Sequence, residues 1–223
     1  MDLRHEWKHE ISVSDRIILR QRLRTVMQPD PHAINGCYQI FSLYFDTPGD
    51  RALREKNDGV SFREKYRIRC YNGDTGVIFL EKKTKIGGLG TKDSIRISAG
   101  EVERLLKGDL EWMFDPERPL AQELHSRMVS QGLRPKVIVG YTREPFVYAP
   151  GNVRVTMDYD IRIGFCCADF LRPDPVTIPA RDNPILLEVK WDEFLPSVIR
   201  DAVQLEGRHT SAFSKYSACR VYG

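Results

Sequence analysis

Lysines and arginines recur at alternate positions along several stretches of this chain, a spacing that could build a site for phosphate groups. Residues two apart share one face of a β-strand. Lys65, Arg67 and Arg69 therefore share a face, as do Glu81, Lys83 and Lys85. Guanidinium forks match phosphate oxygens, and ammonium groups add point charge. The pattern predicts ionic strand faces suited to a chain of phosphates.

Three further stretches alternate charged and apolar residues in the same way. Their polar sets are Glu6, Lys8 and Glu10; Arg154, Thr156, Asp158, Asp160 and Arg162; and Glu188 and Lys190. For any one strand, a solvent-exposed sheet face explains the pattern. Five such strands favour a sheet that closes with its apolar face against helices and its ionic face around a lumen. Cations buried there must find anions, because an unpaired buried charge is strongly unfavourable.

The elements that would position these residues are mostly strands. Period-two or β-rich sequence predicts them over Glu6–Ile11, Gln39–Phe45, Ser61–Tyr71, Val77–Lys85, Lys92–Ile97, Lys136–Val147, Val153–Ile163 and Ile185–Trp191. Amphipathic helices are predicted over Ser12–Met27, Leu120–Gln131 and Leu195–Leu205, and between the capping box of Ser98 and Glu101 and the stop at Gly108. We predict an α+β fold, an antiparallel eight-stranded β-barrel with a few peripheral helices.

Composition bounds the class of protein. A chain of 223 residues with 41% hydrophobic and 29% charged residues suits one soluble domain over residues 1–223. The net charge of +3 is too balanced for bulk attraction to nucleic acid. No apolar run approaches the roughly 18 residues of a membrane span. Strand-like sequence begins at once, so we expect no signal peptide and a cytoplasmic protein, and the five cysteines without metal spacing are expected to be reduced thiols.

Five segments, in order along nearly the whole chain, carry a likeness to a known family. They are RHEWKHE from Arg4, SLYFDT from Ser42, YRIRCY from Tyr66, LEKKTK from Leu80 and FSKY from Phe213. Together they resemble a bacterial VTC domain, a branch of the triphosphate tunnel or CYTH-like superfamily. The resemblance implies an eight-stranded tunnel in which basic residues bind ATP phosphates and growing polyphosphate beside a divalent metal, Mn²⁺ or Mg²⁺.

The resemblance also implies residue roles. Catalytic contacts to the reacting phosphates fall to Arg67, Arg69, Lys83, Arg143 and Arg154, substrate binding falls to Lys8, Lys92, Ser214 and Lys215, and metal binding falls to Glu188. The order Glu6-x-Lys8-x-Glu10 departs from the Glu-x-Glu-x-Lys of the superfamily's hydrolases and cyclases, which favours the polymerase-like branch. Arg143 shares strand parity with Val139 and Tyr141, so a lumenal Arg143 is expected to need a bulge or another register.

The activity implied is that of an ATP-dependent polyphosphate polymerase, a phosphotransferase that needs no nucleophile of its own. Two alternatives use the same tunnel: a triphosphate or polyphosphate hydrolase, with water as acceptor, and a non-catalytic polyphosphate-binding module. Nucleic acid is disfavoured, because carboxylates lie beside the basic residues and interleaved aromatic platforms are missing. A separate membrane protein is the candidate partner, since the chain itself has no predicted span.

Overall fold

The computed structural model describes residues 4–205 and 213–220. Its strands are β1 (His5–Ile11), β2 (Gln28–Pro29), β3 (Tyr38–Asp46), β4 (Phe62–Tyr71), β5 (Asp74–Ile86), β6 (Leu89–Ile97), β7 (Arg134–Tyr148), β8 (Val153–Gly164), β9 (Ile178–Pro179) and β10 (Ile185–Trp191). Its helices are α1 (Val13–Val26), α2 (Arg51–Asn57), α3 (Ala99–Leu106), α4 (Pro119–Gln131), α5 (Ser197–Val203) and α6 (Lys215–Ala218). The eight predicted strands and four predicted helices are confirmed, whereas α2, α6 and the two-residue strands β2 and β9 were not predicted.

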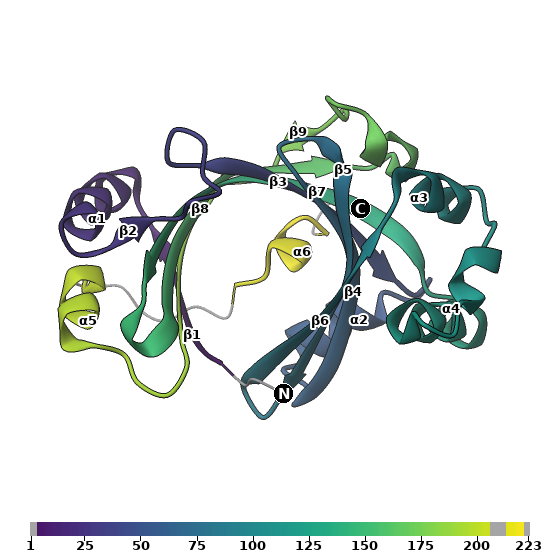
Figure 1. Cartoon of the computed structure of the whole chain (residues 1–223), viewed down its shortest axis with the longest axis horizontal. Coiled ribbons are helices and arrows are strands. Elements are labelled where there is room, and N and C mark those ends of the chain that lie inside the picture. Colours follow the sequence, from purple (N-terminus) through teal and green to yellow (C-terminus); the bar gives the residue numbers. More distant parts are fainter. Residues whose placement is uncertain (1–3, 206–212, 221–223) are drawn as a thin grey trace.

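The strands form one antiparallel sheet that curls around a central space (Figure 1). Its order is β1-β10-β8-β7-β3-β4-β5-β6, with β2 and β9 pairing to β7 and β8. The predicted class is confirmed, but the predicted closed barrel is wrong in one respect. In the described part of the chain, β1 and β6 are joined by a single isolated bridge between Arg4 and Gly90 and by no ladder. Alternation indicates which face of each strand is apolar, but it does not determine whether the two edge strands of a sheet pair with each other, so the sequence pattern left this seam open.

Helices cover the outside of the sheet in two groups, as the alternation predicted. Leu19 and Leu23 of α1 pack with Ile199 of α5 over one side, and Val102 of α3 packs with Leu124 of α4 over the other. Each group buries apolar side chains of the strands beneath it. Both α1 and α3 begin at serine capping boxes, at Ser12 and Ser98. No helix among the described residues is long and apolar enough to cross a membrane.

The short helix α6 lies inside the curled sheet and fills part of it (Figure 1). Tyr216 is 2% exposed and Cys219 is fully buried, in a cluster that includes Val139 and Tyr141 of β7. One part of the interior is therefore an apolar core, and the remainder is charged. This corrects the argument about Arg143: the face that it shares with Val139 and Tyr141 is the lumenal face, so β7 needs no bulge.

A β-bulge divides the charged part of β8 from its apolar part. The pairing with β7 shifts between Gly140 and Thr142, and Asp160 opposite the shift has a left-handed φ of 49°. Before it, Thr156 faces the interior cavity, and beyond it, Ile161 joins the interior apolar cluster. The prediction that Asp160 and Arg162 continue the charged face of Arg154, Thr156 and Asp158 is therefore wrong, because the extra residue reverses the alternation. Arg162 instead donates hydrogen bonds to Thr177 beside β9.

Truncation of Tyr216 tests whether α6 belongs to the folded core. The Tyr216 hydroxyl donates to the carboxylate of Asp46, which also accepts from the backbone N–H groups of Thr47, Ala52 and Leu53. We expect Tyr216→Ala to lower the free energy of unfolding by about 3–5 kcal/mol and Tyr216→Phe by about 1 kcal/mol, measured by urea denaturation. A loss below about 1 kcal/mol for the alanine variant would show that α6 adds nothing to the core.

Candidate functional site

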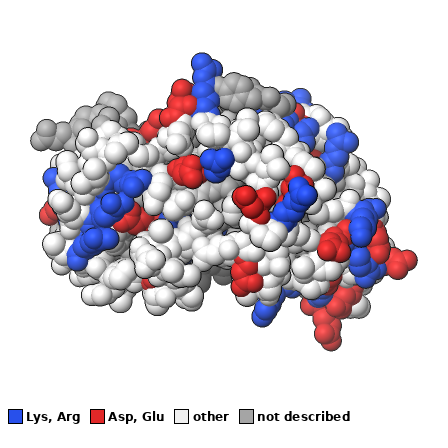
Figure 2. All heavy atoms as spheres, turned by 90° about the horizontal axis from the view of Figure 1, so that it is seen from above, with Lys and Arg blue, Asp and Glu red and all other residues white. Residues whose placement is uncertain are grey.

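The charged part of the interior is a cavity of about 860 Å³. Among the described residues, fourteen lysines and arginines and three glutamates line it. The whole chain carries a net charge of only +3, so the residues away from the cavity are negative in sum. Figure 2 shows one outer face, on which basic and acidic side chains are interspersed between broad uncharged areas. The positive charge is therefore concentrated inside the molecule. This agrees with the nearly balanced net charge, which implies that any anion site must be local.

All ten residues predicted for the site line this one cavity. They are Lys8, Arg67, Arg69, Lys83, Lys92, Arg143, Arg154, Glu188, Ser214 and Lys215. Strands β1, β4, β5, β6, β7, β8 and β10 supply eight of them, Ser214 precedes α6, and Lys215 is its first residue. The predicted grouping is observed, while the role of each residue stays a prediction.

Arg67 is held rigidly by a carboxylate on the neighbouring strand. It lies directly opposite Glu81, and its Nη2 and Nε atoms are 2.5 and 2.6 Å from Glu81 Oε2. Arg67 Nη1 donates to the Tyr44 hydroxyl at 3.0 Å, and Lys92 Nζ donates to Glu81 Oε1 at 3.0 Å. Burial raises the pKa of Glu81, but Arg67, Arg69 and Lys92 outweigh it and hold that pKa well below its ordinary value. Glu81 thus stays charged beside two cations.

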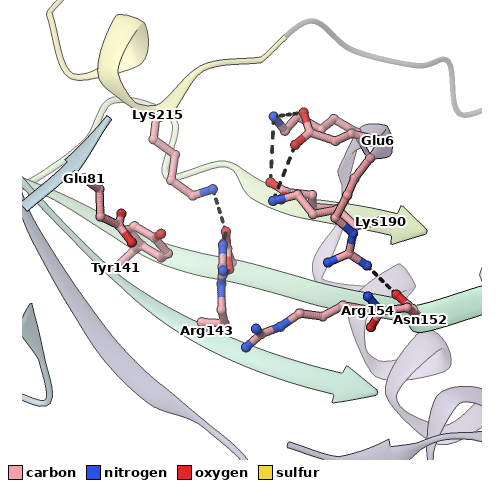
Figure 3. A network of polar contacts seen from close by, with 12 residues as sticks. Glu6, Glu81, Tyr141, Arg143, Asn152, Arg154, Lys190 and Lys215 are labelled. Carbon is pink, nitrogen blue, oxygen red and sulfur yellow. Dashed lines mark hydrogen bonds and ion pairs between the residues drawn. The ribbon is translucent and has the colours of Figure 1, made fainter. Parts of the chain in front are cut away.

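Arg143 forms a second unit of the same kind (Figure 3). Its Nε and Nη2 atoms each lie 2.7 Å from an oxygen of Asp158, directly opposite on β8. Lys215 reaches from α6 to Asp158 Oδ2 at 2.5 Å. Asp158 is fully buried, which raises its pKa, but Arg143 and Lys215 together lower it below the ordinary value. One carboxylate again faces two cations, which leaves a net positive charge.

Two further arginines are also positioned by tyrosine hydroxyl groups. Arg69 is 5% exposed and donates to Ser42 Oγ at 3.0 Å and the Tyr141 hydroxyl at 3.1 Å. Within the described ranges it has no carboxylate partner, so its charge is available to an anion. Arg154 donates through Nη2 to Asp30 and to the Tyr38 hydroxyl, both at 2.6 Å. Its Nε is buried and has no partner among those residues.

Glu188 lies in a group of two carboxylates and two lysines between β1 and β10. Lys8 contacts Glu6 and lies 3.8 Å from Glu188, and Lys190 contacts Glu188 and lies 3.5 Å from Glu6. Burial raises the pKa of Glu188, but Lys190 and Lys8 outweigh it and hold the pKa well below its ordinary value. Glu10, the third charged residue of this face, is exposed and outside the lining.

This group fits a divalent cation only in shared coordination. Among the residues that the structure describes, no cluster of three or more acidic, histidine or cysteine side chains could hold a metal alone. Glu6 and Glu188 nevertheless converge on the same lysines, so both could face one ion. Mg²⁺-type ions often take one or two carboxylates and complete their shell with phosphate oxygens and water. The donor set suits that mode and excludes a closed protein cage.

Sequence reasoning gave no site role to part of the lining. Lys56, Arg63, Lys65, Lys85 and Lys190 all line the cavity. Alternation had placed Lys65, Lys85 and Lys190 on the ionic faces, and it could also have identified Arg63, which shares the face of Lys65. Lys56 lies on the unpredicted helix α2 and had no comparable signal. The carboxylates Glu81 and Asp158 were noted on ionic faces, but their pairing with arginines depends on strand register.

Comparison with known proteins decides the family. A sequence model described as the VTC domain matches residues 3–222, nearly the whole chain. The chain belongs to the VTC domain family. The resemblance inferred from the sequence is thereby confirmed, and the comparison with curated protein sequences gave no match.

Several solved structures are similar to this VTC domain at low identity. One protein from Pyrococcus horikoshii OT3 is 10% identical with a TM-score of 0.49, covering 96% of this chain and 97% of its own. A second protein from that organism is 14% identical with a TM-score of 0.45, covering 90% and 84%. The capping enzyme triphosphatase of Mimivirus is 9% identical with a TM-score of 0.38, covering 91% and 86%. The family assignment rests on the sequence match alone.

Lys65 gives the VTC domain a measurable pH dependence. Burial, with Lys56 and Arg63 nearby, lowers the pKa of Lys65 to about 8. Between pH 8 and its ordinary pKa near 10.4, the unfolded chain binds a proton that the folded chain does not, so stability rises with pH. We expect Lys65 to contribute at most about 3 kcal/mol to the rise in the free energy of unfolding across this range, measured by urea denaturation. Lys65→Met should remove this contribution, and an unchanged difference between native and variant across these pH values would contradict the assignment.

Proposed function

We propose that this VTC domain is an ATP-dependent polyphosphate polymerase, a phosphotransferase that extends a phosphate chain with the γ-phosphate of ATP. The observation that supports this most is the cavity itself, in which cations outnumber carboxylates and arginines are fixed before any ligand binds. The family assignment supports it independently. The proposal includes the predicted cytoplasmic location, the roles of the ten site residues and a membrane protein as partner.

The proposed chemistry relies on position and charge. In phosphoryl transfer, charge spreads over the equatorial oxygens of the transferred group while donor and acceptor oxygens lie in line. Arg67 and Arg143 are each locked by a carboxylate, so they can stabilise that charge without reorganisation. Arg69 contributes a buried guanidinium that has no carboxylate of its own among the described residues. No side chain needs to act as a nucleophile, because the acceptor is the phosphate chain.

Glu188, with Glu6 beside it, is the proposed contact for a divalent cation, Mn²⁺ or Mg²⁺. When bound, such an ion would neutralise charge on phosphate oxygens. Lys8 and Lys190 now contact both carboxylates, and incoming phosphates would offer these ammonium groups new partners. The protein's contribution here is to hold carboxylate and ammonium groups side by side, so that phosphate and cation can bind together.

Nucleic acid is a poorer ligand for this cavity. Five tyrosines of the described part of the chain line it, but three of them, Tyr38, Tyr44 and Tyr141, accept hydrogen bonds from Arg154, Arg67 and Arg69. A tyrosine used in this way orients an arginine, whereas single-strand binding requires exposed rings on which bases stack. The tyrosines therefore serve the arginines, as expected of a cavity for inorganic phosphate chains.

Lys82 and Lys83 offer a matched test, because they are adjacent on β5 and face opposite sides of the sheet. Lys83 lines the cavity and has no ion-pair partner among the described residues; Lys190, then Arg67 and burial, hold its pKa well below the ordinary value. Lys82 pairs with Glu64 at 2.8 Å and Glu123 at 2.6 Å on the outside. We expect Lys83→Met to lower chain synthesis by about 10²-fold or more and Lys82→Met to leave it within about threefold.

The measurement uses γ-labelled ATP with Mn²⁺, with and without a short polyphosphate primer, and resolves the products by length. A ladder of labelled chains that Lys83→Met removes and Lys82→Met preserves would support the polymerase. Free phosphate without chains would identify a hydrolase in its place. Tight polyphosphate binding without turnover would identify a non-catalytic binding module.

A further inference from the structure

Four cations at one end of the cavity lack the carboxylates that accompany Arg67, Arg143 and Arg154. Lys56, Arg63, Lys65 and Lys85 all line the cavity. Within residues 4–205 and 213–220, none of the four has a carboxylate within ion-pairing distance. Arg63 Nη1 donates to the backbone carbonyl of Val60 at 2.7 Å, and Lys65 Nζ donates to Ser214 Oγ at 3.4 Å. We name these four residues the mouth cluster.

Strand register places the mouth cluster beyond the predicted catalytic arginines. Arg63 lies directly opposite Lys85, and one interior step further in, Lys65 lies opposite Lys83. The next step is the compensated pair of Arg67 and Glu81. Next to Arg63 and Lys85, at the end of the ladder between β4 and β5, Phe62 lies opposite Ile86. Their side chains are 54% and 49% exposed. The cluster therefore occupies the mouth, where β4 begins and β5 ends.

Two successive like-charged pairs are an unfavourable arrangement. Like charges directly opposite each other destabilise an antiparallel sheet, and Lys56 brings a further cation to the same place. Burial, then Lys56 and Arg63, lowers the pKa of Lys65, and burial, then Arg63 and Lys8, lowers the pKa of Lys56. On the outer face of the same strands, Lys82 is matched by Glu64. The missing carboxylates are thus confined to the lumenal face.

The length of the basic wall favours a chain of phosphates over a single triphosphate group. From Arg69 to Arg63 the interior residues of β4 span six residues, about 20 Å of extended strand. A triphosphate group is shorter than this wall, so phosphates held at Arg67 and Arg69 do not reach Arg63 and Lys85. Lys65 bridges the two zones, because it contacts Ser214 and lies 5.0 Å from the Tyr216 ring.

We propose that the mouth cluster is a second anion subsite, which binds the part of a polyphosphate chain that extends beyond a triphosphate. The inference rests on the proposed function and adds to it a basis for preferring long chains over short ones. Binding there would supply the mouth cluster with the counter-charge that residues 4–205 and 213–220 do not provide.

The test compares the binding of tripolyphosphate and of long-chain polyphosphate by titration calorimetry. The test variant carries Lys56→Gln, Arg63→Gln and Lys85→Gln. The control carries Arg24→Gln, Lys107→Gln and Arg134→Gln, three exposed positions outside the cavity lining with the same change in charge. We expect the test variant to bind long chains at least tenfold more weakly, with a salt dependence reduced by roughly 2 in slope, and to bind tripolyphosphate within twofold of native.

Folding and alternative ligands are checked in the same experiment. The thermal midpoint of the ligand-free test variant should be no lower than that of the native protein, because repulsion is removed. Equal weakening for both phosphates, or for neither, would overturn the inference while leaving the proposed function intact. Native protein that binds neither phosphate would overturn both. Single-stranded RNA is the third ligand tested. If it bound the native protein as tightly as polyphosphate did, and bound the test variant more weakly by the same factor, the inference would be overturned in favour of a general polyanion surface.

Discussion

Burial of surplus positive charge inside a curled sheet is the constraint on which the rest of this structure depends. Removing one cation from water without a partner is very costly, and even a paired buried charge is marginal. The VTC domain meets the constraint by giving Arg67 and Arg143 a carboxylate each, Glu81 and Asp158, with additional tyrosine hydroxyl acceptors. Each carboxylate also faces a lysine, so compensation stays incomplete and the cavity keeps its affinity for anions.

The pairing of each buried cation with a carboxylate depends on strand register. Arg67 meets Glu81, Arg143 meets Asp158 and Lys8 meets Glu188, because each pair lies directly across two antiparallel strands. A slip of one residue would turn every charged side chain toward the outer helices and every apolar one toward the cavity. The apolar packing of α1, α3, α4 and α5 outside the sheet therefore fixes the charged arrangement inside it. The bulge at Asp160 applies the same rule locally, since one extra residue ends the charged face of β8 and begins the apolar part that packs with α6.

The sequence predicts most of the fold because alternation is a local signal. Eight strands, four helices and the assignment of ionic faces to the lumen follow from spacing of two and from capping boxes such as Ser98 with Glu101. The open seam does not follow, since alternation within a strand does not determine whether the edge strands β1 and β6 pair with each other. The helix α6 does not follow from the sequence either. Its four residues are too few for a periodic signal, and its burial depends on the hydrogen bond from Tyr216 to Asp46, which lies far away in the sequence. Arg143 shows the limit most clearly: its parity was read correctly, but apolar neighbours were taken for the outside, whereas α6 makes part of the lumen apolar.

The division of the cavity into compensated and uncompensated cations suits the proposed reaction. Arginines locked by carboxylates cannot follow a moving phosphate chain, so they are suited to the reacting phosphates, whose geometry must be fixed to within a fraction of an ångström. Lysines without carboxylates have no competing partner to leave, and their flexible stems and point charges can accept successive phosphates in more than one position. A polymerase requires both behaviours in one tunnel, because the transferred phosphate must be held while the growing chain must advance. The observed order, with the locked Arg67 deeper in the cavity than the unmatched Arg63 and Lys85, places each behaviour where the proposed reaction requires it.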